Sequence, residues 1–271
     1  MVSWDKETLR KLQMTELEML VEVDRICRKH NIKYSLDGGT LLGAVRHQGF
    51  IPWDNDADVM MSREEYERFF KICQTELDTD KFFLQEFRTD AEYRWGYSKL
   101  RRNGTLFLRE GQEDINCHHG VFIDIFIFDN VPDGFLPRRA QYDLCYIIRK
   151  GLYSVVGCKR AENVMKRAIY KLASFVPLSA WRKALLKAQK AAEGKRTQLI
   201  SHLTFPNRKQ IRYGLSTSYY DEYTELDFEG KQFMVIKEYD RYLRDLFDDY
   251  MILPPVEKRQ SHPALKLELL D

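Results

Sequence analysis

The stretch LDGGTLLGAVRHQGFIPWDNDADVMM, residues 36–61, decides the fold of this chain. Gly38 and Gly39 have no Cβ atom, so the backbone there can turn sharply and approach a ligand closely. The residues from Thr40 onward predict a short helix that includes Arg46. A glycine turn that leads into a helix presents free N–H groups and the positive end of the helix dipole. The pattern therefore predicts a phosphate-binding turn.

Three aspartates follow the short helix at every second position, namely Asp54, Asp56 and Asp58. Apolar residues come directly after them, so we expect the aspartates to enter a strand. Side chains two residues apart on a strand share a face and lie about 7 Å apart. Carboxylates that point the same way repel one another unless a hard cation lies between them. The simplest interpretation is a divalent-metal site beside the phosphate-binding turn.

Two other interpretations of the aspartates stay open. An acidic run of this kind is also typical of a solvated loop. It is similar, too, to the start of a calcium-binding EF-hand loop with Glu65 at the twelfth position, but Val59 stands where that loop needs glycine. The glycine pair upstream favours the metal and phosphate interpretation over both.

A glycine pair, a spacer and an acid-x-acid pair entering a strand resemble the signature of the nucleotidyltransferase fold. The whole stretch resembles the LicD family of bacterial phosphocholine transferases, which is related to fukutin-related proteins. The resemblance extends to KLRRNGT at 99–105, GVFIDIF at 120–126, FEG at 228–230 and PPVEKRQSH at 254–262. The basic stretch between about 138 and 213 carries no motif of that family.

Residues 120–128, GVFIDIFIF, are nearly all apolar, which predicts a central strand that is covered on both faces. Asp124 in its middle needs a partner, because burying a charge alone is costly. In the family that the chain resembles, a third acid arrives on a neighbouring strand, and Asp124 matches it. The alternative is a buried aspartate that is hydrogen-bonded to backbone N–H groups. Asp129, at the end of the strand, is the less favoured candidate.

The resemblance also implies substrate-binding residues. Lys99 and Arg101 share a face of a strand and could offset charge on a donor phosphate, although a solvated edge strand is the common alternative. A choline head group needs aromatic faces, for which Trp53 and Trp95 are candidates, unless they are core residues. The remaining expected substrate-binding residues are Arg46, Lys231, Arg259 and His262.

The function that the resemblance implies is metal-dependent transfer of phosphocholine, or a related group, from a CDP-linked donor to a sugar hydroxyl. CDP-choline is the expected donor, a glycan or glycolipid precursor of teichoic acid or lipopolysaccharide the acceptor, and CMP the product. Asp56, Asp58 and Asp124 would hold Mg²⁺ or Mn²⁺. Gly38, Gly39 and Thr40 would cradle phosphate, and Asp54 would orient or deprotonate the acceptor hydroxyl.

Three competing functions remain open. A nucleotidyltransferase would use a nucleoside triphosphate and release pyrophosphate. A calcium-binding module would change conformation with Ca²⁺ and have no turnover. A basic adaptor for nucleic acid would bind arbitrary oligonucleotides with a steep dependence on salt.

The composition predicts a folded cytoplasmic protein. Of 271 residues, 44% are hydrophobic and 13% aromatic, which supports a real core. Five cysteines without a C-x-x-C spacing favour free thiols in a reducing compartment. The N-terminus lacks the plan of a signal peptide, and no run of about 18 apolar residues could span a membrane.

Positive charge is concentrated in one segment. Residues 138–213 hold 18 lysines and arginines against 3 acidic residues, whereas the rest of the chain holds 25 against 38. An anionic partner is expected for such a segment. Its apolar helical faces favour peripheral contact with the inner face of an anionic membrane. The alternative is an ordinary helical subdomain with a basic outer face, and the lack of a nucleic-acid motif predicts no nucleic acid partner.

Helical and strand patterns alternate without regular βαβ repeats, which predicts an α+β fold. We expect helices over 4–30 and from a capping box at Ser62 onward, and antiparallel strands at 81–88, 93–102 and 105–109. Apolar residues such as Phe233 and Ile236 predict a last long helix. The expected parts are a nucleotidyltransferase-like mixed sheet flanked by helices (1–137), a basic helical insert (138–213) and a helical C-terminal part that completes the site (214–271).

Overall fold

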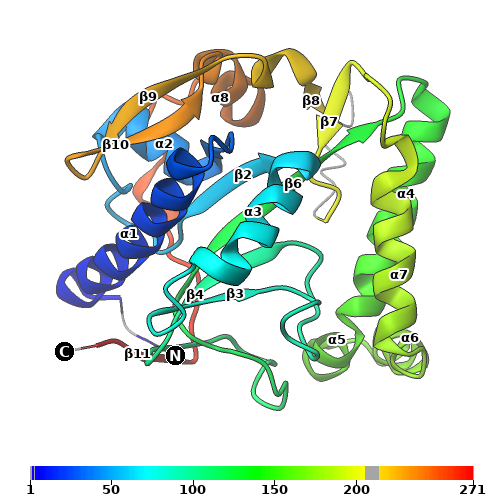
Figure 1. Ribbon diagram of the computed structural model, residues 1–271. Coiled ribbons are helices and arrows are strands. Elements are labelled where there is room, and N and C mark those ends of the chain that lie inside the picture. The colour runs from blue at the N-terminus through cyan, green and yellow to red at the C-terminus, as the bar shows by residue number, and fades with distance from the viewer. Residues whose placement is uncertain (1, 3, 205–213, 271) are drawn as a thin grey trace.

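A computed structural model describes residues 2, 4–204 and 214–270 of the chain (Figure 1). Its main element is a mixed sheet with the strand order β1-β2-β6-β4-β3, and β7 and β8 extend it from the far end of β6. The strands are β1 (Ser35–Leu36), β2 (Asp58–Ser62), β3 (Phe82–Gln85), β4 (Ser98–Arg102), β6 (Phe122–Val131), β7 (Leu199–Ser201) and β8 (Leu215–Ser216).

Strand β6 is the centre of this sheet, as its apolar run predicts. It pairs in parallel with β2, where Asp58 is the register partner of Asp124. It pairs antiparallel with β4, where Lys99 lies opposite Asp124. Because one strand is parallel and the other antiparallel, the predicted mixed sheet is confirmed.

Helices α1 (Lys6–Lys29) and α3 (Arg63–Glu76) pack on each other and against β2, β4 and β6. Helix α1 buries a stripe of apolar side chains, and the side chain of Asp5 caps it by accepting from the N–H of Thr8 at 2.8 Å. Helix α3 begins after Ser62, whose hydroxyl accepts from the N–H of Glu65 at 3.3 Å. Both predicted helices and the cap at Ser62 are confirmed.

The C-terminal part is not purely helical, which corrects the prediction. Phe233 and Ile236 lie in β10 (Lys231–Ile236), which pairs with β9 (Tyr223–Phe228) as a hairpin. Glu229 and Gly230 between the strands have φ of 51° and 72°, as a two-residue hairpin turn requires. The helix begins only afterwards, as α8 (Tyr239–Phe247), beside α2 (Gly38–His47).

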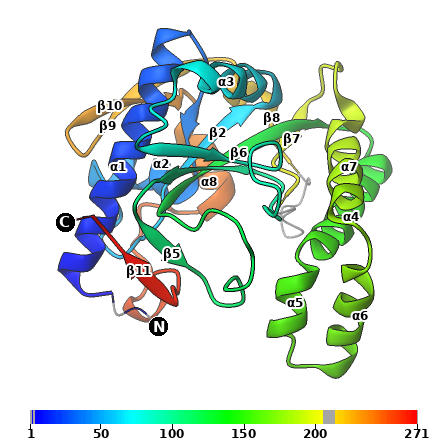
Figure 2. The ribbon, with the colours of Figure 1, turned by 60° about the horizontal axis from the view of Figure 1, so that its bottom comes forward.

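The predicted pairing of the third strand, at 105–109, is wrong as well. Strand β5 (Leu106–Leu108) pairs with β11 (Lys266–Glu268) near the C-terminus and not with β4 (Figure 2). The reason is topological, since both edges of β4 are already occupied by β3 and β6.

The basic insert is mostly helical, and its helices lie beside the sheet, whereas its residues 199–201 join the sheet as β7 (Figures 1 and 2). It has its own small core, which includes Tyr142, Cys145 and Leu185. Of the predicted insert, residues 205–213 lie outside the described residues. Its helices are α4 (Phe135–Leu152), α5 (Ser154–Arg160), α6 (Val164–Ser174), α7 (Leu178–Gln189) and the single turn η1 (Lys190–Ala192), and the other short turns of the chain are η2 (Thr217–Tyr220) and η3 (Val256–Lys258). No helix in the described ranges has the length and apolar character needed to cross a bilayer.

Candidate active site

The glycine turn passes directly over the aspartates. Helix α2 begins at Gly38, which has φ of 49°, and Asp37 caps the helix by accepting from the Gly38 N–H at 2.7 Å. A Cβ atom at Gly39 would lie 2.7 Å from Asp54 Oδ2. Only glycine therefore lets the backbone approach the carboxylates this closely, and the two predicted halves of the site do adjoin.

Thr40 is hydrogen-bonded to the first residue of β2, Asp58. Its Oγ1 accepts from the backbone N–H of Asp58 at 2.8 Å, and its side chain is buried. The hydroxyl thereby positions Asp58, and the expected contact of Thr40 with phosphate, which involves its backbone N–H, stays a prediction.

Asp54, Asp56 and Asp58 line one cavity of about 450 Å³. Only Asp58 belongs to β2, so the expectation that all three enter the strand is corrected. The other two lie in the preceding loop, which Asn55 fixes: its amide donates to the His262 carbonyl at 2.9 Å, and it accepts from the His262 N–H at 2.6 Å. The C-terminal segment thus determines where the loop carboxylates point.

The cluster holds more negative charge than its neighbours balance. Burial, followed by repulsion from Asp56, raises the pKa of Asp54 to about 8. Burial and the neighbouring carboxylates also raise the pKa of Asp58 well above its usual value. Burial acts in the same direction on Asp56, but the hydrogen bond and charge of His262, whose Nε2 lies 3.1 Å from Asp56 Oδ2, lower its pKa.

The donor set is suited to a hard divalent cation, because it consists of carboxylate oxygens that repel one another without one. Among the described residues, no three His, Cys, Asp or Glu side chains are grouped closely enough to hold a metal ion as they stand. The fit therefore rests on the chemistry of Asp54, Asp56 and Asp58 in their shared cavity and on the position of Asp124 beside Asp58 in the sheet.

Asp124 lies beside Asp58, as expected, but it already has a partner. Lys99 Nζ contacts Asp124 Oδ1, and both side chains are buried. Burial, only partly offset by Asp124, lowers the pKa of Lys99 to about 7. The ammonium also lies 3.4 Å from the ring centroid of Phe122. The expected third carboxylate and one expected phosphate-binding cation thus form a single buried pair beside Asp58.

Arg101 is not brought to the cavity. It is only 2% exposed; its Nε donates to Gln85 Oε1 at 2.7 Å and its Nη1 donates to the Gly120 carbonyl at 2.6 Å. The guanidinium thus links β4 to β3 and to the residues that precede β6, which indicates a structural role for Arg101.

Four other expected residues do gather at the cavity. Arg46, Trp53 and His262 line it, and the Arg259 guanidinium lies 4.8 Å from the ring centroid of Trp53. Arg46 Nη1 donates to the Tyr250 carbonyl at 2.6 Å. The cavity that holds the carboxylates therefore also has basic and aromatic lining residues.

Lys231 and Trp95 lie elsewhere. Lys231, at the start of β10, lines a groove against α1 with Glu18. Trp95 packs against Tyr93, with ring centroids 5.1 Å apart, and lines a small cavity beside α7. The structure does not bring either residue to the acidic cluster.

Two charged residues at the site had no sequence-based prediction. Glu16 on α1 is only 1% exposed, and burial followed by repulsion from Asp56 and Asp54 raises its pKa well above the usual value. Arg109, just beyond β5, helps to lower the pKa of Asp56. A signal for Glu16 existed, because it interrupts the buried stripe between Leu12 and Leu20 at a spacing of four residues.

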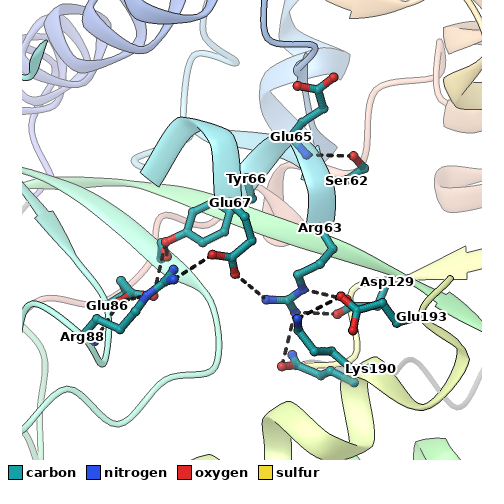
Figure 3. A network of polar contacts seen from close by, with 12 residues as sticks. Ser62, Arg63, Glu65, Tyr66, Glu67, Glu86, Arg88, Asp129, Lys190 and Glu193 are labelled. Carbon is teal, nitrogen blue, oxygen red and sulfur yellow. Dashed lines mark hydrogen bonds and ion pairs between the residues drawn. The ribbon is translucent and has the colours of Figure 1, made fainter. Parts of the chain in front are cut away.

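Asp129 is part of a different network at the other end of β2 and β6 (Figure 3). Arg63 donates to its two carboxylate oxygens at 2.8 and 2.7 Å. Glu67 and Arg88 continue the network across α3, with Arg88 Nη1 2.7 Å from Glu67 Oε2. This network pairs opposite charges, which indicates a structural role for Asp129.

The chain is similar in sequence to known proteins. The family model described as LicD/FKTN/FKRP, nucleotidyltransferase domain, matches residues 31–136. The chain is 32% identical over 265 residues to the lipopolysaccharide cholinephosphotransferase LicD of Haemophilus influenzae, with 95% of this chain and 96% of that protein covered. The chain belongs to the LicD family.

An uncharacterized protein of Rickettsia typhi is 40% identical over 139 residues, which cover 49% of this chain and 39% of that protein. The LicD nucleotidyltransferase domain, as matched, contains the glycine turn, the three loop and strand aspartates and Asp124. Glu16, Arg259 and His262 lie outside that match, so α1 and the C-terminal segment add residues to the candidate site from beyond the matched range.

Proposed function

We propose that this LicD-family chain transfers phosphocholine, or a related phospho-alcohol, from a CDP-linked donor to a sugar hydroxyl of a cell-surface glycan precursor, with release of CMP. The observation that carries the proposal is the cluster of Asp54, Asp56 and Asp58 in one cavity under the glycine turn. The name of the Haemophilus influenzae relative, a lipopolysaccharide cholinephosphotransferase, supports the transferred group and the glycan acceptor.

Asp56, Asp58 and Asp124 are the proposed ligands of Mg²⁺ or Mn²⁺, which would supply positive charge to the donor phosphates. Arg46 lines the cavity and Arg259 lies against its lining residue Trp53, so both add fixed positive charge to the site. Such charge favours a phosphoryl group in transfer. His262 holds the Asp56 carboxylate by its hydrogen bond of 3.1 Å.

In the proposed reaction the acceptor hydroxyl oxygen forms a bond to the phosphorus that carries choline. The bond from that phosphorus to the bridging oxygen breaks, and CMP leaves with the electron pair. Asp54 orients the hydroxyl and takes its proton, because burial and the charge of Asp56 raise the pKa of its carboxyl and so make its carboxylate a stronger base than that of an ordinary aspartate.

The test is CMP release by the purified chain with Mg²⁺ or Mn²⁺, a glycolipid extract and, in turn, CDP-choline, CDP-ethanolamine and CDP-ribitol. We expect release only when metal, donor and acceptor are all present, with CDP-choline the fastest donor. Absence of CMP with every donor, or pyrophosphate release from nucleoside triphosphates instead, would contradict the proposal.

A further inference from the structure

A second cavity, of about 390 Å³, adjoins the acidic cluster, and Asp58 lines both cavities. Its described lining is aromatic and apolar, with the carboxylates of Asp37 and Asp58 at one end and no lysine or arginine. The rings and apolar side chains that line it belong to Phe126, Phe128, His202, Leu215, Tyr242 and Leu246.

The two cavities have opposite chemical character. The first has basic residues, Arg46 and His262, in the same lining as the carboxylates, and this suits the phosphates of a nucleotide. In the second, burial lowers the pKa of His202 to about 4, so its ring is neutral at physiological pH. Aromatic faces beside carboxylates are the surroundings that bind a quaternary ammonium group.

The sheet sets the distance between phosphate and ammonium. Asp124, Phe126 and Phe128 alternate along one face of β6, and Asp124 is the register partner of Asp58. Phe126 therefore lies about 7 Å along the strand from the carboxylates. Four bonds join the phosphorus of phosphocholine to its nitrogen, and together they span about 5 Å. The side chains that extend from the strand account for the difference between this span and the distance along the strand.

The rings around this point are close to one another. Phe126 has its centroid 4.9 Å from that of His202 and 5.0 Å from that of Tyr97, and Phe128 lies 5.4 Å from His202. Phe126 is only partly buried, so part of its surface is available to the cavity.

We propose that this cavity, lined by Phe126, Phe128, His202 and Tyr242, binds the trimethylammonium group of the donor and selects choline over smaller amines. This inference rests on the proposed transfer from a CDP-linked donor. It assigns the specificity to Phe126, the last residue of the GVFIDIF stretch, and to three residues outside the quoted motifs, Phe128, His202 and Tyr242.

The test compares CDP-choline with its uncharged isostere, the CDP ester of 3,3-dimethylbutanol, and with CDP-ethanolamine. For the wild-type chain we expect CDP-choline to bind about tenfold or more tightly than either, measured by calorimetry and as KM for CMP release. Phe126→Leu keeps an apolar side chain but removes the aromatic face, so it should reduce this preference about tenfold while binding of CDP itself stays unchanged.

Two further variants keep the outcome decisive. Leu246→Trp fills the cavity from α8 and should weaken CDP-choline binding even if Phe126→Leu folds poorly. Trp53→Leu, in the first cavity, is the matched control and should leave the preference for choline intact. Loss of preference in Trp53→Leu with none in Phe126→Leu overturns the cavity assignment alone, whereas no binding of any CDP ester to the wild type overturns the proposed function with it.

A second inference rests on a separate observation, the surface of α6. This helix has no buried residue, and apolar side chains that are 59–79% exposed project from it. They recur at helical spacing and form one stripe. Its members are Val164, Met165, Ile169, Leu172 and, at the end of the helix, Phe175. Figure 2 shows α5 and α6 at the end of the insert, away from the sheet.

The charge around this stripe is one-sided. Helix α6 carries Lys166, Arg167 and Lys171 and no acidic residue, within an insert that has 18 basic residues against 3 acidic ones. A stripe of apolar side chains flanked by lysine and arginine is complementary to an anionic lipid surface.

We infer that α6 docks on an anionic lipid bilayer, with the apolar stripe at the level of the head groups. Cosedimentation with vesicles of phosphatidylcholine containing phosphatidylglycerol tests this. We expect binding that falls with salt and is weak for phosphatidylcholine alone.

Leu172→Glu should reduce the bound fraction about tenfold, and Met14→Glu, an exposed site on α1, should not. CMP release with a soluble acceptor should be equal in both variants. Equal binding to neutral vesicles, wild-type binding by Leu172→Glu, or a stripe that instead mediates self-association in sedimentation velocity would overturn the inference.

Discussion

The strand pair β2 and β6 carries buried aspartates at both ends, in contrasting surroundings. At one end Asp58 and Asp124 are register partners, and burial followed by the neighbouring carboxylates raises the pKa of Asp58. At the other end Asp129 accepts two hydrogen bonds from Arg63 (Figure 3). A carboxylate without sufficient countercharge, such as Asp58, costs stability and is typical of functional sites, whereas the paired Asp129 fixes α3 on the sheet.

The largest expected effect comes from Asp58→Asn. The substitution removes a proposed metal ligand, so turnover should fall at least about a thousandfold. Because it also relieves repulsion in the cluster, the free energy of unfolding in EDTA should stay equal or rise. CMP release and chemical denaturation measure the two effects, and wild-type turnover by this variant would contradict the metal assignment.

Asp129→Asn should show the opposite pattern. The amide leaves the buried Arg63 with a weaker partner, so the free energy of unfolding should drop by about 3 kcal/mol. Turnover per folded molecule should remain near that of the wild type. A large loss of turnover with unchanged stability would mean that both ends of the strand pair are catalytic.

Glu16→Gln sharpens the comparison at the acidic end. The pKa of Glu16 is raised in the folded chain, so its carboxyl stabilises the fold fully below pH 4.5 and loses that contribution as pH rises toward the folded pKa. The variant should therefore be about 1 kcal/mol more stable than the wild type in EDTA at pH 8 and equal to it at pH 4. Urea denaturation at both values measures this, and a stability loss at pH 8 would contradict it.

A smaller effect on stability is expected at His118, which lies away from both ends of the β2–β6 strand pair. Its Nδ1 accepts from the Gly120 N–H at 3.0 Å, and burial followed by the charge of Arg101 lowers its pKa to about 4. A histidine with a depressed pKa loses stability as pH falls below its unfolded value of 6.5. The free energy of unfolding of the wild type should therefore fall between pH 7 and pH 5. In His118→Asn, whose amide oxygen can replace Nδ1, this fall should be about 1 kcal/mol smaller. An unchanged slope would contradict this.

Sequence patterns predicted the parts of the fold that depend on local periodicity. The apolar run around Asp124 gave the central strand, and the cap at Ser62 gave the start of α3. The pairing of β5 with β11 joins segments far apart in the sequence, which no local pattern contains. The hairpin of β9 and β10 was missed because its apolar residues also fit a helical spacing, and Glu229 is an uncommon residue at positive φ.

The site shows the same division. The glycine turn and the aspartates form a motif, so their convergence could be predicted. Whether Lys99 and Arg101 face the cavity or the core could not be predicted. Strand alternation puts both side chains on one face but does not show what covers that face. Glu16 was missed because an amphipathic helix was judged by its apolar stripe, although the charged residue inside that stripe is the informative one.

The central claim is that the cluster around Asp58, and not the paired Asp129, binds a divalent cation. Mn²⁺ titration followed by electron paramagnetic resonance tests it on the wild type, Asp58→Asn and Asp129→Asn. The account predicts saturable Mn²⁺ binding in the wild type and in Asp129→Asn, and at least about a hundredfold weaker binding in Asp58→Asn. Equal Mn²⁺ affinity in all three proteins would contradict it.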